Sequence, residues 1–323
     1  MGGGDDWLKS KLSQLLEYSK ELCEDGLPHY PAHSWSVVKL LVLAGWVWVY
    51  TTIIPKYYDE YWYVDLLAGS GTTFVEETGD VVPGSAFVAH YFAREKFRRY
   101  VLVEKSEDRF RALSQRAARV MGDLARPLRG DCNELAGEIA DEIREAGAHA
   151  LVFIDNEGLR AAAEWETVKT LMGVPSDLII LFPTVGARRP WGSAQDGERL
   201  VRSLDRFYGT GVWRLARGGE DLLSLYLERL RKAFLELRGR RPFVSSIRIG
   251  TRSYYYDLIL VCKDGPYVRA WDHIKSRLDW EDPETVGLVL RILRGEIVPL
   301  DFFTDLEEQV GGRGRQETLD RYF

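Results

Sequence analysis

Short apolar segments that recur along the chain are the feature that most constrains its fold. Four of them are Tyr61–Leu67, Tyr100–Glu104, Ala150–Asp155 and Asp177–Phe182. Each is rich in β-branched, aliphatic or aromatic residues, and helical segments lie between them. Strands that alternate with helices form parallel sheets, because a parallel pair needs a crossover connection. The sequence therefore predicts an α/β fold with a doubly wound, Rossmann-like, mostly parallel sheet.

The rest of the chain is expected to cover or extend this sheet. Periodic apolar residues predict helices at Trp7–Cys23 and at Trp35–Ile54, the second capped by Ser34. The segments Phe243–Ile249 and Tyr254–Cys262 flank a short turn and predict a terminal antiparallel hairpin. These features divide the chain into three parts.

The three predicted parts have the following bounds. Residues 1–60 form an N-terminal helical segment packed on the core, and residues 61–310 form the Rossmann-like domain with a helical insertion at about 191–242. Residues 311–323 begin with Gly-Gly-Arg-Gly-Arg and form a flexible tail. The uncharged segment Leu40–Pro55 spans about 24 Å as a helix, less than the ~30 Å of a bilayer core. We expect a buried core helix there and a cytoplasmic protein.

The first three predicted strands each end in a carboxylate, namely Asp65, Glu104 and Asp155. Ligands of open α/β sheets bind beyond the carboxyl ends of the strands. Isolated buried charge is costly, so three carboxylates at one sheet edge indicate a binding site. The alternative is that they cap turns at the strand ends.

A glycine turn, Ala68-Gly69-Ser70-Gly71, follows the first strand, and we expect a helix directly after it. The turn does not fit a dinucleotide site, because Phe74 stands where the third glycine belongs. The acid that ends the second strand, Glu104, also lies well beyond the ~20 residues that this fingerprint requires. A P-loop is excluded because no Gly-Lys-Ser/Thr follows.

The spacing instead resembles the S-adenosylmethionine (SAM) methyltransferases. The resemblance implies that Asp65, Gly69 and Gly71 hold the methionine end of SAM. It implies that Glu104 binds both ribose hydroxyls and that Asp131 contacts the adenine amino group. The chemistry is reasonable, because one carboxylate can accept hydrogen bonds from both hydroxyls of a ribose.

Several longer strings resemble the three-Cys-motif partner (TcmP) family and together cover roughly residues 30–275. They are His33 with Lys39 and Leu43, Tyr63–Gly71, Pro83–Ala89, Phe153–Gly158, Trp165–Thr167, Leu181–Pro183 with Arg188 and Arg189, and Tyr256–Leu260. The resemblance implies a methyltransferase-like Rossmann fold and leaves the activity undefined.

One segment departs from that family. It tends to have Asp-Pro-aromatic-Gly where this chain has Asp155-Asn-Glu-Gly158. Glu157 replaces the aromatic residue that amino-methyltransferases of DNA stack on a flipped base, and the Pro-Cys of cytosine-C5 enzymes is absent. Asp155 and Glu157 remain the candidate catalytic residues, as a general base or to orient an acceptor. Glu157 as a solvated loop acid is the alternative.

The last eight residues, Gln316 to Phe323, carry a separate motif. They fit Gln-x-x-aliphatic-x-x-aromatic-aromatic and resemble the PIP box that docks on the sliding clamp PCNA. A single 3₁₀ turn would bring Leu319, Tyr322 and Phe323 onto one face, with Gln316 filling a polar pocket. The alternative is a terminal segment that packs on its own domain.

These observations support three hypotheses. The leading one is a SAM-dependent methyltransferase that PCNA recruits to DNA in replication or repair, with Arg188 and Arg189 contacting the polyanion. The second is a PCNA-bound adaptor or nucleotide-binding module that has lost methyl transfer. The third is a nuclease with Mg²⁺ on Asp65, Asp155 and Glu157.

Composition adds two constraints. Three cysteines without C-x-x-C spacing argue against disulfides and against a structural zinc site, so no resident metal is expected. Only two Asn and five Gln accompany abundant charge, which favours a thermophilic, archaeal source. The net charge of −6 does not exclude DNA, because a clamp would supply the attachment.

Overall fold

The structure of the chain is a computed structural model that describes residues 2–20, 22, 25–156, 158, 162–184, 198–250, 255–277 and 283–296. Three groups of predicted functional residues lie outside the described residues. They are Glu157, the pair Arg188 and Arg189, and the motif of Gln316, Leu319, Tyr322 and Phe323.

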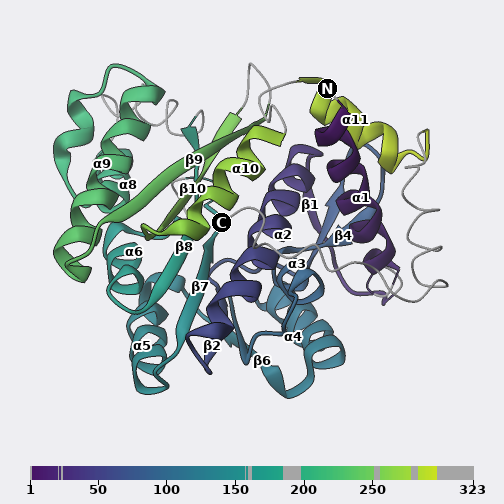
Figure 1. Ribbon diagram of the computed structural model, residues 1–323, viewed down its shortest axis with the longest axis horizontal. Coiled ribbons are helices and arrows are strands. Elements are labelled where there is room, and N and C mark those ends of the chain that lie inside the picture. The colour runs from purple at the N-terminus through teal and green to yellow at the C-terminus, as the bar shows by residue number, and fades with distance from the viewer. Residues whose placement is uncertain are drawn as a thin grey trace.

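A seven-stranded sheet in the order β6-β5-β2-β7-β8-β10-β9 forms the centre of the molecule (Figure 1). Its strands are β2 (Tyr61–Asp65), β5 (Arg99–Glu104), β6 (Ala125–Arg129), β7 (His149–Ile154), β8 (Ser176–Phe182), β9 (Pro242–Gly250) and β10 (Tyr255–Lys263). The first five strands in this order, from β6 through β5, β2 and β7 to β8, pair in parallel. Strand β10 is antiparallel to both of its neighbours, β8 and β9. This is a Rossmann-like α/β fold, and it confirms the predicted mostly parallel sheet and its terminal hairpin.

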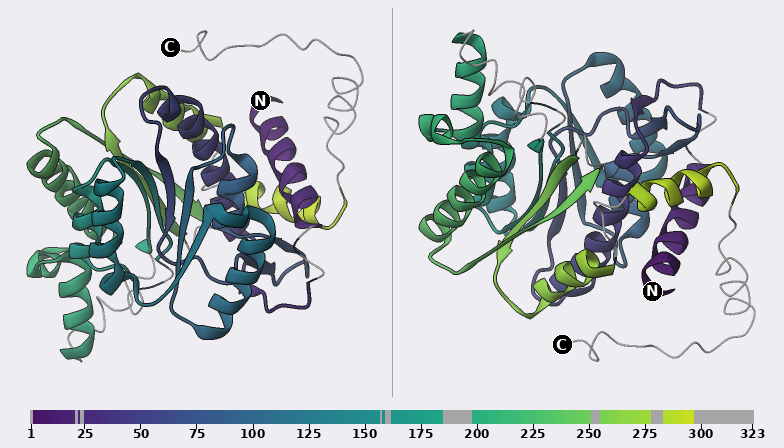
Figure 2. Two further views of the ribbon diagram at one scale, coloured as in Figure 1. Left: turned by 90° about the horizontal axis from the view of Figure 1, so that it is seen from below. Right: turned by 90° about the horizontal axis from the view of Figure 1, so that it is seen from above.

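Helices cover both faces of this sheet (Figure 1 and Figure 2). One face is covered by α1 (Gly2–Ser19), α2 (Trp35–Ile53), α3 (Ser85–Phe92), α4 (Glu107–Met121), α10 (Arg269–Arg277) and α11 (Pro283–Leu293). The other face is covered by α5 (Cys132–Glu145), α6 (Trp165–Met172), α8 (Glu198–Tyr208) and α9 (Gly219–Arg238). Strand β2 is buried throughout: Tyr61 and Tyr63 join the first core and Trp62 and Val64 the second, since successive side chains alternate.

Helix α2 is the most apolar element. With its continuation to Lys56 it is long and apolar enough to cross a membrane, but 89% of its most apolar window is buried inside the protein. It therefore fits the predicted core helix. The expected cap is wrong, because the Ser34 side chain makes no capping hydrogen bond. The Ser34 backbone N–H instead donates to Glu77 Oε2 at 3.0 Å.

A second, three-stranded sheet overturns the expectation of a helix directly after Gly71. It has the order β1-β3-β4, from β1 (Tyr30–Ala32), β3 (Thr72–Val75) and β4 (Val81–Pro83). Thr72 to Val75 are strand-forming residues, and the chain turns back before α3 begins at Ser85. The Gly84 N–H donates to Gly71 O at 2.8 Å, which returns α3 to the glycine turn.

The predicted helical insertion at about 191–242 is helical over α8 and α9. Helix α9 packs on β9 and buries Leu222, Tyr226, Leu230 and Phe234 in the second core. Both helices lie in the chain between β8 and β9.

Candidate functional site

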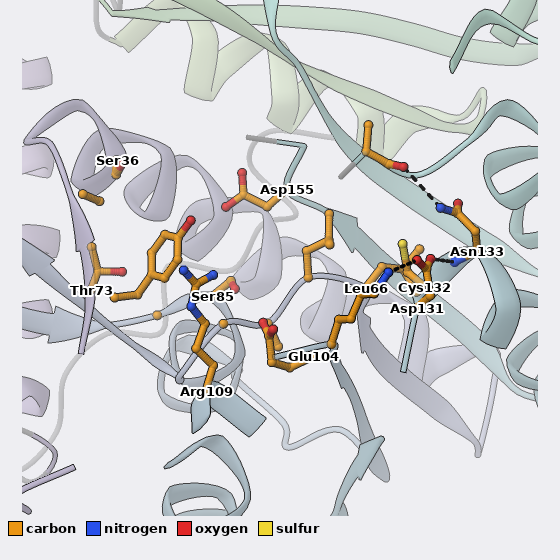
Figure 3. Close-up of a pocket in the computed structure, with 18 of the residues that line it drawn as sticks. Ser36, Leu66, Thr73, Ser85, Glu104, Arg109, Asp131, Cys132, Asn133 and Asp155 are labelled. Carbon is orange, nitrogen blue, oxygen red and sulfur yellow. Dashed lines mark hydrogen bonds and ion pairs between the residues drawn. The ribbon is translucent and has the colours of Figure 1, made fainter. Parts of the chain in front are cut away.

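A cavity of about 340 Å³ opens where β2, β5, β6 and β7 end (Figure 3). The chain runs from β2 outward to β5 and β6, then crosses to β7 on the other side of β2. Open α/β sheets bind ligands at this switch point. The volume is at the lower end of the ~300–1,000 Å³ found for small-molecule sites.

Glu104 ends β5 and lines the cavity. Its side chain lies in the middle of the view in Figure 3, and the residue is only 8% exposed. Oε1 accepts a hydrogen bond of 2.7 Å from the N–H of Ser106, the residue before α4. The connection between strand and helix thus fixes this carboxylate at the cavity, and its role as a ribose-binding acid stays a prediction.

Asp131 lies after β6, at the start of α5, and also lines the cavity. It accepts hydrogen bonds from the Asn133 N–H at 2.9 Å and from Lys105 Nζ at 2.8 Å. Burial acts to raise the pKa of Asp131, but these hydrogen bonds outweigh it and the pKa is lowered. Beside it, burial raises the pKa of Cys132 to about 12, so that thiol stays protonated at neutral pH.

The two glycines of the turn have different roles. Gly69, at φ +62°, lines the cavity and has open space where a side chain would begin. Gly71, at φ +83°, does not line it, and a Cβ there would lie 2.4 Å from Phe87 Cε2. Gly71 therefore allows α3 to pack against the turn, and it lies outside the lining of this cavity.

Asp65 is fully buried and is not among the residues that line the cavity, which corrects its predicted role as a ligand contact. Its Oδ2 accepts hydrogen bonds from Ser85 Oγ at 2.6 Å and from Tyr63 Oη at 3.2 Å, and its Oδ1 accepts one from the Leu67 N–H at 3.2 Å. Burial raises the pKa of Asp65 to about 7, although the Ser85 and Leu67 hydrogen bonds oppose the shift. Asp65 thus joins the glycine turn to α3. Ser85, the first residue of that helix, lines the cavity.

Asp155, directly after β7, meets a residue that sequence reasoning did not identify as functional. Lys39 Nζ of α2 lies 2.5 Å from Asp155 Oδ2, and both side chains are largely buried. Among the described residues, none donates a hydrogen bond to the buried Asp155 Oδ1. Lys39 lies at the edge of the uncharged part of α2. A single charge in an otherwise apolar helix is the sequence feature that could have identified it as a functional residue.

Of the three acids proposed for a nuclease, Glu157 lies outside the described residues, and the other two are engaged by partners of their own. Asp65 is occupied by hydrogen bonds behind the cavity wall, and Asp155 is paired with Lys39. Within the part of the chain that the structure describes, no group of three His, Cys, Asp or Glu side chains is placed to hold a metal ion.

Both asparagines of the chain hold the segment after β7 in place. Asn133 Oδ1 accepts hydrogen bonds from the Glu164 N–H at 2.8 Å and from Thr167 Oγ1 at 2.6 Å. Asn156 Nδ2 donates to Leu181 O at 3.1 Å, and its Oδ1 accepts from the Ala163 N–H at 2.9 Å. The Asn of Asp-Asn-Glu-Gly is thus a structural link, where the TcmP pattern has proline.

No protein-family model matches the chain, so its resemblance to the TcmP family stays a prediction. No curated protein sequence matches it either.

Solved structures do match at a distance. Protein LPL1258 from Legionella pneumophila is 12% identical, with a TM-score of 0.44, over 83% of this chain and 94% of that one. An O-methyltransferase from Bacillus cereus, solved with SAH, is 12% identical with a TM-score of 0.38, over 79% and 91%. M. jannaschii TYW2, solved with AdoMet, is 10% identical with a TM-score of 0.37, over 71% and 75%.

Proposed function

We propose that the chain binds SAM in this cavity and transfers its methyl group to an acceptor. The observation that carries the proposal is the placement of two carboxylates along one wall. Glu104 lies in the middle of the view and Asp131 toward one end (Figure 3). Glu104 suits the two donor hydroxyls of a ribose, and Asp131 suits the donor amino group of adenine. Asp131 keeps free acceptor positions beside its bonds to Lys105 and Asn133, since a carboxylate has about four.

The residues around these carboxylates define the rest of the proposed chemistry. SAM supplies an activated methyl group on its sulfonium. The chain contributes alignment, which is a large source of rate in a transfer between two bound groups. Lys39 holds Asp155 at the cavity wall, where its carboxylate would orient an acceptor N–H or O–H.

Titration calorimetry with SAM tests the proposal. Wild type should give a saturable heat, and Glu104→Ala should weaken binding roughly 10- to 100-fold, because hydrogen bonds to a charged group are lost. Glu107→Ala is the matched control, since Glu107 is an exposed acid close to Glu104 in the sequence, at the first position of α4. Absence of heat with wild type, or equal loss in both variants, would contradict the proposal.

A second candidate is a nucleotide-binding module without methyl transfer. The observation that favours it is the Lys39–Asp155 pair, because Lys39 occupies the carboxylate that would otherwise be available to a methyl acceptor. The two candidates differ in turnover: a methyltransferase releases SAH when its acceptor is present, whereas a module binds SAM without consuming it.

We also propose that the tail attaches the protein to PCNA through Gln316, Leu319, Tyr322 and Phe323, with Arg188 and Arg189 contacting DNA. These two parts of the proposal rest on the sequence pattern alone.

A further inference from the structure

The end of the cavity opposite Asp131 contains a cation and several hydroxyl groups that Glu104 and Asp131 do not explain. In Figure 3, Arg109 of α4 lies on the same side as Ser36, Thr73 and Ser85, while Asp131 lies on the other. The inserted sheet forms this end, because β1 contributes Tyr30 and β3 contributes Thr73.

Arg109 differs from the other cations that line the cavity. Three of those form ion pairs, and they are Lys39 with Asp155, Lys105 with Asp131, and Arg206 with Glu164. Among the residues that the structure describes, Arg109 has no acidic partner, and its guanidinium lies 4.1 Å from the centroid of the Tyr30 ring. Stacking on an aromatic face orients the guanidinium and leaves its N–H groups available in the plane.

We infer that Arg109 binds the carboxylate at the amino-acid end of the SAM molecule, an inference that rests on the proposed function. A guanidinium binds a carboxylate through two parallel hydrogen bonds. Glu104 lies between Arg109 and Asp131 (Figure 3), so an elongated ligand places its ribose at Glu104, its adenine at Asp131 and its carboxylate at Arg109. Tyr30 is a positioning residue, because it acts through Arg109.

The inference is tested by calorimetry with two ligands that differ at one end. SAH and 5′-methylthioadenosine share the adenosine and the thioether, and only SAH carries the amino acid. We expect Arg109→Gln to weaken the binding of SAH roughly 10- to 100-fold, because one charge-assisted contact is lost. The binding of methylthioadenosine should be unchanged. Arg109→Lys should recover part of the SAH affinity, since it restores the charge but not the fork.

Arg111→Gln is the matched control, since Arg111 lies on the same helix, is paired with Glu107 and does not line the cavity. It should bind both ligands as wild type does. Equal losses of both ligands in Arg109→Gln, or no loss of either, would overturn the assignment while leaving the proposed nucleoside site intact. If wild type binds neither ligand, the proposed function fails and the assignment fails with it.

Discussion

Buried charged side chains differ in the partners that they have, as two examples show. At the cavity, Lys39 and Asp155 are buried as a pair. At the other end of the strands, Asp177 is 1% exposed near the start of β8, where a tyrosine and a histidine face it. Tyr267 Oη lies 3.4 Å from Asp177 Oδ1, and His149 Nε2 lies 3.9 Å from it. The stability of the protein should therefore respond to substitution of the Lys39–Asp155 pair, and to pH through Asp177.

Substitution of Lys39 leaves Asp155 buried without its counter-charge. Lys39→Met should therefore lower the free energy of unfolding by about 3 kcal/mol, as measured by denaturant titration. Lys169→Met is the control, because Lys169 forms an exposed i,i+3 pair with Glu166 that is worth less than about 0.5 kcal/mol. Similar losses in the two variants would show that the Lys39–Asp155 pair has no special role.

Asp177 should make stability depend on pH. Burial raises its pKa from 3.8 to about 7, so the folded protein retains a proton that the unfolded chain has released. The stabilisation that the retained proton gives the folded protein is thus fully present below about pH 3.8, and it is lost as the pH rises through 7. Burial also lowers the pKa of His149 to about 3, so that ring is neutral throughout this range.

Asp177→Asn should remove this dependence. Between pH 5 and pH 8, wild type should lose about 2 kcal/mol more of its unfolding free energy than the variant, measured by denaturant titration at each pH. Asp65, whose pKa is also about 7, contributes equally to both proteins. Asp141→Asn, an exposed change on α5, should behave as wild type. Parallel pH profiles for wild type and Asp177→Asn would contradict the assignment.

Glu104 and Gly69 line the cavity as expected, because they lie at or just after strands that the sequence predicts. Asp131 also lines it, but β6 was not predicted, and Asp131 was singled out by the resemblance to SAM methyltransferases. The sequence did not place Lys39 or Arg109 there. Lys39 meets Asp155 across 116 residues of sequence, and Arg109 meets Tyr30 of another sheet. Such contacts depend on how helices cross the sheet, which periodicity does not determine. The Asp65 carboxylate was misassigned because the route of β3 and β4 was not predicted.

Among the elements, the glycine turn and the sheet inserted after it shape one end of the cavity. Strands β2, β5, β7 and β8 could be predicted because they are continuous apolar segments. Strand β6 was missed, since its Ala-Arg-Pro-Leu-Arg sequence contains two arginines and a proline. Such a sequence is tolerated at a sheet edge, which is where β6 lies.

The turn offers a matched pair of substitutions. Gly69→Ala should cost about 1–2 kcal/mol, because only the left-handed backbone is strained. Gly71→Ala should cost about 3–5 kcal/mol, because its Cβ also collides with the Phe87 ring of α3. Thermal and denaturant unfolding measure both costs. Equal costs would show that α3 does not pack on the turn as described.

For the whole molecule, the N-terminal segment and the sheet share a core. Arg116 of α4, 0% exposed, donates to Asp25 Oδ2 at 2.7 Å, to Pro28 O at 3.0 Å and to Ser70 O at 2.8 Å. These bonds join the segment before β1 to the glycine turn. The proposed PCNA motif, by contrast, is a short linear pattern, and we expect it to act independently of the cavity.

Independence of tail and cavity can be measured. Tyr322→Ala with Phe323→Ala should abolish capture by immobilised PCNA, because the aromatic contacts are lost, and should leave SAH affinity within about two-fold. Asp320→Ala with Arg321→Ala changes positions that the motif leaves open and should retain capture. Undiminished capture by the first variant would contradict the tail proposal without affecting the cavity.

The central claim is that the cavity at the ends of β2, β5, β6 and β7 holds SAM. A crystal structure of the protein with SAH tests it most directly. We predict both ribose hydroxyls within hydrogen-bond distance of the Glu104 carboxylate, the adenine amino group beside Asp131 and the amino-acid carboxylate beside Arg109. SAH bound elsewhere, or a cavity that stays empty at saturating SAH, would contradict the claim.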